Sequence, residues 1–243
     1  MSAATTTSTE GPAQEKKPWW ALIAILLGVS LIVLEGSIVN VLIPTIVQDL
    51  SINRTDVLWI TSIYSLIFAA LLITFGVLSD RIGRKRMFMM GTVVFIVFNT
   101  LAGASTSANM LILARAGEAV GGAMMLPTSM AIINVNFKGP MRAAAFGLWG
   151  AVFGGMAAFG PLLGGWLAEV ASWRWAFYIN IPLGIASLIL VKIFITESKG
   201  VDRRGLDWSG VLLSSLGLGL VVFGLIEGQS VGWWTSITTW NLG

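Results

Sequence analysis

The sequence predicts an all-α membrane protein with seven transmembrane helices. Of its 243 residues, 56% are hydrophobic and only 11% are charged, whereas soluble domains carry roughly 25% charged residues. The mean hydropathy is +0.83. Apolar segments of spanning length follow one another from residue 19 almost to the end of the chain, which a soluble helical domain would not need.

Short connections rich in charge, glycine and proline separate the expected helices. They lie at Pro44, residues 80–86, residues 138–140 and residues 199–207. The helices themselves are expected at residues 19–43, 57–78, 87–104, 110–133, 142–168, 175–195 and 206–226.

The first 18 residues are predicted to be a disordered tail, because they are rich in Ser, Thr, Ala and Lys and lack apolar periodicity. The apolar run that follows, residues 19–43, would span about 37 Å as a helix. No small-residue cleavage site interrupts this run before Glu35. We therefore expect a retained first span and not a signal peptide.

The distribution of Lys and Arg predicts a multi-pass protein of the cell membrane with a cytoplasmic amino terminus. In this orientation only Arg54 and Arg174 of the 15 basic residues face out, and Arg115 lies inside a span. The basic excess therefore marks cytoplasmic loops. It predicts a lipid bilayer as partner and no nucleic acid. Trp233, Trp234 and Trp240 would lie at the outer interface.

The absence of cysteine and histidine restricts the chemistry that the chain can perform. It excludes disulfides, thiol nucleophiles, imidazole bases and the usual zinc ligands, so we predict no metal site and no cofactor. Three ionisable residues lie well inside spans: Glu35, Arg115 and Glu118. A charge at mid-membrane costs at least about 2.5–3.5 kcal/mol, and such residues usually have a function.

These three residues are expected at similar depths in the outer half of the membrane. Arg115 and Glu118 are three residues apart and share one helix face, which continues through Gly122 and Met125. We expect them to face Glu35 across a water-accessible interior. Burial disfavours an ionised carboxyl group and a nearby cation favours it, so movement of the cation would load and release a proton. The structural alternative is a self-neutralising Arg115 and Glu118 pair, with Glu35 hydrogen-bonded to backbone.

Glycine is unusually dense in the expected fifth helix. The spacings from Gly150 to Gly154 and from Gly160 to Gly164 allow close helix contact, and Pro161 would kink the helix. Tight packing alone explains much of this pattern. The residues considered as a possible cavity wall are Asn40, Met124, Met125, Trp149 and Phe153, although methionine and aromatic residues at such positions more often serve packing or lipid contact.

The connection after the second expected helix reads Gly-Val-Leu-Ser-Asp-Arg-Ile-Gly-Arg-Lys-Arg at residues 76–86. This segment resembles the signature loop of the major facilitator superfamily. A cytoplasmic loop requires only an excess of positive charge, which does not explain the ordered positions of Gly, Asp and the basic residues. The resemblance implies a network from Asp80 to Arg84 that latches helix ends in one conformation. The expected latch residues are Gly76, Asp80, Arg81, Gly83, Arg84 and Lys85.

Two further motifs are similar to those of drug:proton antiporters. Residues 34–44 look like their first-helix motif, although Asp is more usual where Glu35 stands. Residues 111–123 resemble the fourth-helix motif, whose arginine, here Arg115, is implicated in proton coupling. Ala119 replaces an expected Gly and Glu118 an expected Gln, so a helix contact and the local protonation chemistry depart from the family pattern.

The fifth expected helix is similar to the antiporter motif that favours export over uptake. Its matching residues are Gly150, Gly154, Gly160, Pro161, Gly164 and Gly165. Residues 173–182 and 207–210 look like the fourteen-helix branch, the drug:proton antiporter-2 family. Together the motifs cover residues 34–210.

The resemblance implies the amino-terminal half of a transporter. Residues 19–196 would form a six-helix bundle of inverted three-helix repeats, and residues 197–243 a cytoplasmic linker, a seventh helix and an outward loop that leads to a missing carboxy-terminal half. The expected activity is proton-coupled efflux of drugs or other small amphipathic compounds. The proton gradient replaces any cofactor, and the partner would be a carboxy-terminal half or a second copy.

Three alternatives to this function stay open. One is a dedicated exporter of a single metabolite or antibiotic, and another is a membrane partner that regulates a different protein without transporting anything. The third is an intramembrane enzyme that uses Glu35 and Glu118 as an acid and base pair. The sequence disfavours the enzyme because it holds no recognisable nucleophile constellation, and we predict a protein without enzymatic activity.

Overall fold

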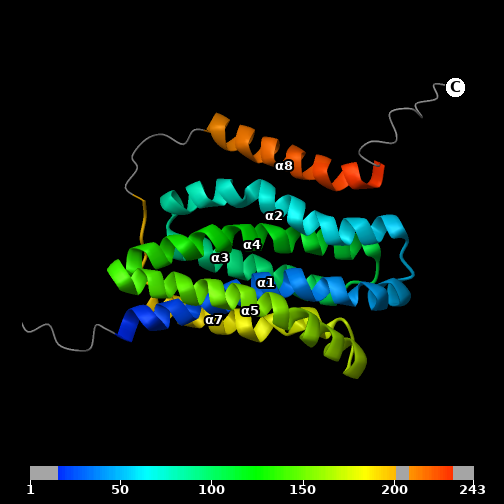
Figure 1. The fold of residues 1–243 in the computed structure, drawn as a ribbon, viewed down its shortest axis with the longest axis horizontal. Helices are drawn as coiled ribbons and strands as arrows, with labels where there is room; N and C mark the ends of the chain where they lie inside the picture. Colours follow the sequence, from blue (N-terminus) through cyan, green and yellow to red (C-terminus); the bar gives the residue numbers. More distant parts are fainter. Residues whose placement is uncertain (1–15, 201–207, 232–243) are drawn as a thin grey trace, which may run out of the picture.

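A computed structural model describes residues 16–200 and 208–231, and over these residues the chain forms helices and no strands (Figure 1). The helices are α1 (Lys16–Leu50), α2 (Arg54–Ile82), α3 (Arg84–Gly103), α4 (Ala108–Asn136), α5 (Gly139–Val170), α6 (Trp175–Tyr178), α7 (Asn180–Phe194) and α8 (Trp208–Val231). Helices α6 and α7 form one apolar span, so this part of the chain contains seven helices able to cross a membrane. The predicted fold class is confirmed.

Two predicted helix boundaries were wrong. Pro44 does not end the first helix, because α1 continues to Leu50. A proline is tolerated inside a membrane-spanning helix because neighbouring helices and side chains satisfy the backbone group that it leaves without a partner. Residues 80–86 do not form an extended connection either. Helices α2 and α3 are separated by Gly83 alone, whose φ of +120° turns the chain within one residue.

Parts of the predicted domain organisation lie outside the described residues. Most of the predicted tail belongs to residues 1–15, and residues 16–18 already lie in α1. The predicted linker and outward loop include residues 201–207 and 232–243, and the latter contain Trp233, Trp234 and Trp240. These predictions stay untested.

The helices pack in two groups that exchange partners. Helix α4 packs against α2 and α3, whereas α1 packs against α5 and α7; α1 contacts α4, and α3 contacts α7. Thus α1 packs on helices that come after α4 in the chain, and α4 packs on helices that come between α1 and α4. Helix α8 lies along the outer side of α2 (Figure 1), where the hydroxyl groups of Thr74 and Ser215 form a hydrogen bond.

Glycines allow close contacts between helices. A Cβ atom at Gly121 of α4 would lie 2.8 Å from the carbonyl oxygen of Gly91 in α3. On the other side of the bundle, Gly160 and Gly164 of α5 pack directly against α1. The spacing from Gly160 to Gly164 thus serves the predicted close contact. A Cβ atom at Gly150 or Gly154 would meet nothing within 4 Å, so this second spacing faces open space in the described chain.

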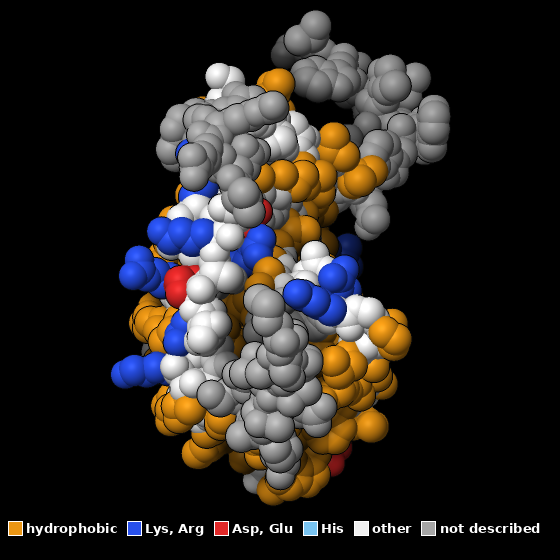
Figure 2. Space-filling model, turned by 90° about the vertical axis from the view of Figure 1, so that its left-hand side faces the viewer, with side chains coloured by type: hydrophobic (Ala, Val, Ile, Leu, Met, Phe, Trp, Pro, Cys, Tyr) orange, Lys and Arg blue, Asp and Glu red, His pale blue; other side chains and the backbone are white. Residues whose placement is uncertain are grey.

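Basic side chains gather at one end of the bundle. Figure 2 shows Lys and Arg side chains clustered on the end where α2 ends and α3 begins. At the opposite end, Arg174 donates to Asp49 Oδ2 over 2.7 Å and to the carbonyl oxygen of Ser105 over 3.1 Å. The charge asymmetry of the sequence is therefore an asymmetry between the two ends of the bundle.

Candidate functional site

Glu35, Arg115 and Glu118 meet in the interior, and we call them the charge cluster. Arg115 Nη1 donates to Glu35 Oε1 over 2.8 Å and to Glu118 Oε2 over 3.0 Å. The side chain of Arg115 is 3% exposed, and both carboxyl side chains are 0% exposed. Arg115 therefore contacts both carboxyl groups directly, and the groups do not face one another across a water-accessible space. The structural alternative is half met: Arg115 does pair with Glu118, but Glu35 accepts from the side chains of Arg115 and Asn180 and not from backbone.

Helix α2 covers the guanidinium group of Arg115. The Cζ atom lies 4.5 Å from the ring centroid of Tyr64, and Nε donates to the carbonyl oxygen of Ile60 over 3.4 Å. A cation above an aromatic face is stabilised by the ring quadrupole, and more strongly so away from water. Tyr64 and Ile60 therefore help to hold a cation that has lost its hydration.

Two buried amides, which the sequence analysis did not single out, extend the cluster. Asn180 Nδ2 donates to Glu35 Oε2 over 2.9 Å and to Asn99 Oδ1 over 2.7 Å. Asn99 Nδ2 donates to the carbonyl oxygen of Phe95 over 3.0 Å. The sequence marks them only weakly as site residues, because each is a single uncharged amide within an apolar segment. Side chains from α1, α2, α3, α4 and α7 thus converge on one site.

The start of α7 explains the position of Asn180. Pro182 has no N–H group to donate to the carbonyl oxygen of Tyr178, and the helix is interrupted at Ile179, immediately before Asn180. Ile179 nevertheless keeps helical angles, with φ −62° and ψ −24°. The span therefore runs on through the interruption and brings the amide to the depth of Glu35.

Small residues of α4 bring its neighbours close to Glu118. Gly117 lies against the ring of Phe98 of α3, and a Cβ atom at Gly122 would lie 3.2 Å from the hydroxyl of Tyr64. Larger residues at either position would push α2 or α3 away. The glycines that flank Glu118 in α4 therefore seal the charge cluster between the helices.

The cluster contains two carboxyl groups and one guanidinium. Fully ionised, it would carry one net negative charge away from water, which is costly. Among the residues that the structure describes, two buried side-chain polar atoms lack a hydrogen-bond partner, and these are Glu118 Oε1 and Asn180 Oδ1. One added proton would make the cluster neutral. Within the same residues, no three His, Cys, Asp or Glu side chains gather as metal ligands.

Several of the expected latch residues contact one another or the segment after α7 at the basic end. Arg84 Nη2 lies 2.7 Å from Asp80 Oδ1. Glu197, which the sequence analysis did not single out, accepts from the backbone N–H groups of Lys85 over 3.0 Å and Arg86 over 3.1 Å. A Cβ atom at Gly83 would overlap the carboxyl group of Glu197. The segment after α7 thus binds the first turn of α3.

The other predicted latch residues lie in different surroundings. Lys85 Nζ donates to the carbonyl oxygen of Lys192 over 2.8 Å. The Cβ position of Gly76 lies 3.6 Å from Pro127. Arg81 is exposed at the end of α2.

The residues considered as a cavity wall do not form one surface. Met125 is 0% exposed and belongs to the hydrophobic core. Trp149 donates its indole N–H to Ser129 Oγ over 3.1 Å and stacks on Phe153. Asn40 is exposed and donates to the carbonyl oxygen of Gly36. Packing therefore accounts for Met125, while Asn40 and Phe153 lie at the surface.

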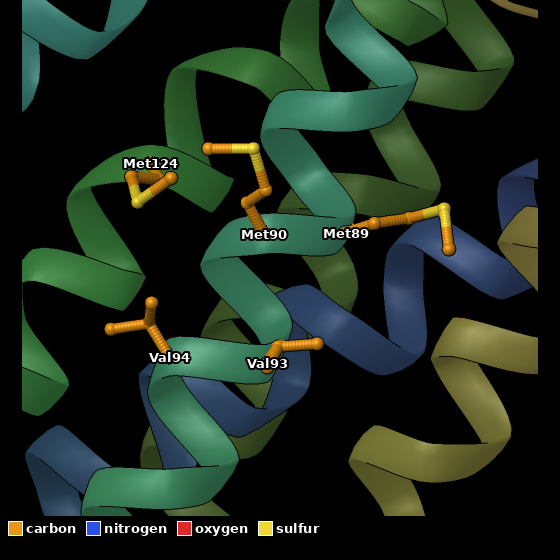
Figure 3. Close-up of a pocket in the computed structure, with 5 residues that line it drawn as sticks. All are labelled: Met89, Met90, Val93, Val94 and Met124. Carbon is orange, nitrogen blue, oxygen red and sulfur yellow. The ribbon is translucent and has the colours of Figure 1, made fainter.

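Met124 lines a shallow apolar groove between α3 and α4 (Figure 3). The other lining residues are Met89, Met90, Val93 and Val94 of α3, and in Figure 3 Met90 points toward Met124 whereas Met89 points away from it. Met90 is 46% exposed and Val93 is 48% exposed. The lining offers no polar side chain to orient a solute, so we assign no substrate site to this groove.

A family model, the Major Facilitator Superfamily, matches residues 25–242. The chain belongs to the major facilitator superfamily. The puromycin resistance protein of Streptomyces alboniger is 37% identical over 92% of this major facilitator chain and 44% of its own length. The tetracenomycin C resistance and export protein of Streptomyces glaucescens is 34% identical over 89% of the chain and 40% of its own length.

A solved structure of the superfamily shows the same fold. It is a bacterial homologue of the human lysosomal transporter Spinster, in an inward-facing and unoccupied conformation, with a TM-score of 0.63 at 18% identity. The likeness covers 81% of this chain and 47% of that one. The major facilitator chain therefore spans less than half the length of the relatives it matches, and it corresponds to their amino-terminal half.

Proposed function

We propose that this chain is the amino-terminal half of a proton-coupled antiporter that exports drugs or other small amphipathic compounds. It would lie in the cell membrane with its amino terminus in the cytoplasm. Membership of the major facilitator superfamily supports transport. The names of two relatives, which include resistance and export, support efflux as its direction. The excess of basic side chains at one end of the bundle supports the orientation.

One observation carries the proton coupling: a single buried guanidinium serves two buried carboxyl groups. With one proton bound the cluster is neutral and is stable when closed between the helices. Without that proton the extra negative charge is costly in the interior. Deprotonation therefore favours a conformation that admits water, and protonation favours closure.

The network around Asp80, Arg84 and Glu197 would stabilise one of these conformations. It joins the end of α2, the start of α3 and the segment after α7. A rigid contact at this end lets the bundle rock as a body while the charge cluster changes its proton. The function requires no enzymatic step.

The substrate site would lie between this half and a second one. Helix α5 leaves Gly150 and Gly154 open, and a second bundle would pack there. We propose a separate carboxy-terminal half or a second copy of this chain as the partner.

A dedicated exporter of one antibiotic is the second candidate. The two relatives are each named for one compound, puromycin or tetracenomycin C. A panel of substrates separates the candidates. A multidrug antiporter moves puromycin and several unrelated lipophilic dyes, whereas a dedicated exporter moves one chemical class.

Transport in liposomes tests the proposal. The chain is reconstituted alone and with a carboxy-terminal half, and a proton gradient is imposed in the presence of the panel. We expect gradient-driven movement that a protonophore stops and that Arg115→Gln abolishes without loss of membrane insertion. Movement that Arg115→Gln leaves unchanged would remove the charge cluster from the mechanism.

A further inference from the structure

We propose that Glu118 is the carboxyl group that takes up and releases the proton, while Asn180, oriented by Asn99, keeps Glu35 ionised as the lasting partner of Arg115. The importance of this division for transport rests on the proposed function. The division itself is a property of this chain and can be measured without transport.

Both carboxyl oxygens of Glu35 accept hydrogen bonds. Oε1 receives Arg115 Nη1 over 2.8 Å, and Oε2 receives Asn180 Nδ2 over 2.9 Å. An ionised carboxylate only accepts, whereas a protonated one must donate from one oxygen. The surroundings of Glu35 offer donors to both of its oxygens and therefore match its ionised form.

Glu118 has a different environment. Its Oε2 receives Arg115 Nη1 over 3.0 Å, but its Oε1 has no partner, and the side chain is 0% exposed. A buried anionic oxygen without a donor is expensive. A proton on Oε1 removes the charge and leaves Oε2 as the carbonyl oxygen that accepts from Arg115.

Asn99 determines which end of the Asn180 amide faces Glu35. Because Asn99 Nδ2 is occupied by the carbonyl oxygen of Phe95, its Oδ1 is left to accept from Asn180. Asn180 must then use its N–H groups on Asn99 and Glu35. Reversing the amide of Asn180 would set oxygen against oxygen at both contacts. The two asparagines are therefore positioning residues that fix a donor on Glu35.

The other groups around Glu118 leave it as the site of exchange. Among the described residues, the ionisable side chains that face it are Glu35 of α1, Tyr64 of α2 and Arg115 of its own helix. Helices α3 and α7 contribute amides. Arg115 Nη1 already contacts both carboxyl groups. When the proton leaves Glu118, the new negative charge therefore lies beside the cation while Glu35 keeps its own contact with Arg115.

Carbon-13 NMR of the side-chain carboxyl groups tests this division. The chain is labelled at the glutamate Cδ position and studied in lipid nanodiscs at neutral pH, where protonated and ionised carboxyl carbons give separate signals. Glu35→Asp and Glu118→Asp each remove one labelled glutamate but keep a carboxyl group. We expect a protonated signal that Glu118→Asp removes and Glu35→Asp retains.

Asn180→Leu tests the same division with both carboxyl groups in place. Without the donor on Oε2, the Glu35 signal should move toward the protonated position and the Glu118 signal toward the ionised one. Asn40→Leu, an exposed amide on α1, is the matched control and should move neither. Thermal unfolding of each variant shows that the fold is retained.

Three results would overturn the proposal. They are loss of the protonated signal in Glu35→Asp, absence of any protonated glutamate at neutral pH, and Asn180→Leu signals identical to those of the unmodified chain. A protonated Glu118 in a chain that fails to transport with its second half would contradict the proposed function alone.

Discussion

For single residues, the loss of one member of the charge cluster lowers the free energy of unfolding more than the neutralisation of all three members does. Arg115 lies between two carboxyl groups and beneath the ring of Tyr64, and all four side chains are buried. Removing one partner of a buried ion pair leaves an uncompensated charge, whereas replacing every partner by neutral groups leaves none.

We predict that Arg115→Gln destabilises the chain by about 3–5 kcal/mol, because two buried carboxyl groups lose their cation. The combined replacement Glu35→Gln, Arg115→Gln and Glu118→Gln should recover most of this loss. Tryptophan fluorescence during thermal unfolding in detergent measures both. Arg54→Gln, at an exposed position at the start of α2, is the control. A triple variant as unstable as Arg115→Gln would contradict this account.

The sequence predicted the charged members of the site but not its amides. Glu35, Arg115 and Glu118 are conspicuous because charges are rare in spans. Their similar depth also followed from helix rise. Asn99 and Asn180 became functional candidates only through contacts between α1, α3 and α7. Such contacts depend on helix rotation and packing, which the spacing of apolar residues does not determine.

At the scale of helices, glycine positions separate internal packing from an open face. Gly160 and Gly164 touch α1, while Gly150 and Gly154 of the same helix meet nothing within 4 Å. In the sequence the two pairs have the same four-residue spacing and cannot be told apart. Only the tertiary arrangement shows which pair holds α5 to α1.

We predict that Gly160→Leu destabilises the chain by about 1–3 kcal/mol, because the added side chain would overlap Ser37 of α1. Gly150→Leu on the open face should leave the unfolding temperature of the chain unchanged. The same variant should weaken association with a carboxy-terminal half in a pull-down assay. Equal loss of stability in both variants would refute this division of the helix.

Helix α3 begins with a cap supplied from a distant part of the chain. Glu197 accepts from the backbone N–H groups of Lys85 and Arg86, which carry the positive end of the helix dipole. The signature segment is visible in the sequence but this carboxylate is not, because Glu197 and Arg86 are 111 positions apart.

We predict that Glu197→Ala lowers the stability of the chain by about 0.5–2 kcal/mol, the usual cost of losing a helix cap. Glu197→Gln keeps one acceptor and should cost less. Thermal unfolding ranks the two variants, with Glu169→Gln as the control at an exposed glutamate of α5. The cap has no energetic role if Glu197→Ala unfolds together with the unmodified chain.

For the molecule as a whole, hydropathy predicts the bundle of seven apolar helices that the described residues form. Spanning length and charge distribution suffice for this outline. The helix ends were less predictable, because Pro44 stays within α1 and Gly83 alone turns the chain. Both depend on how neighbouring helices satisfy the local backbone.

The predicted orientation can be measured by single-cysteine labelling, which has no background because the chain contains no cysteine. Thr106 is exposed between α3 and α4, and Lys138 is exposed before α5 at the other end of the bundle. The two test variants are Thr106→Cys and Lys138→Cys. In intact cells, a membrane-impermeant maleimide should label Thr106→Cys and reach Lys138→Cys only after permeabilisation. The reverse pattern would place the amino terminus outside.

Substrate-triggered proton release tests whether Glu118 exchanges the coupled proton. The chain, assembled with its second half in weakly buffered detergent solution, is mixed with a transported compound while a pH indicator is recorded. The charge cluster predicts a burst of released protons that Glu118→Gln abolishes and Glu169→Gln preserves. A burst of the same size from Glu118→Gln would contradict the account.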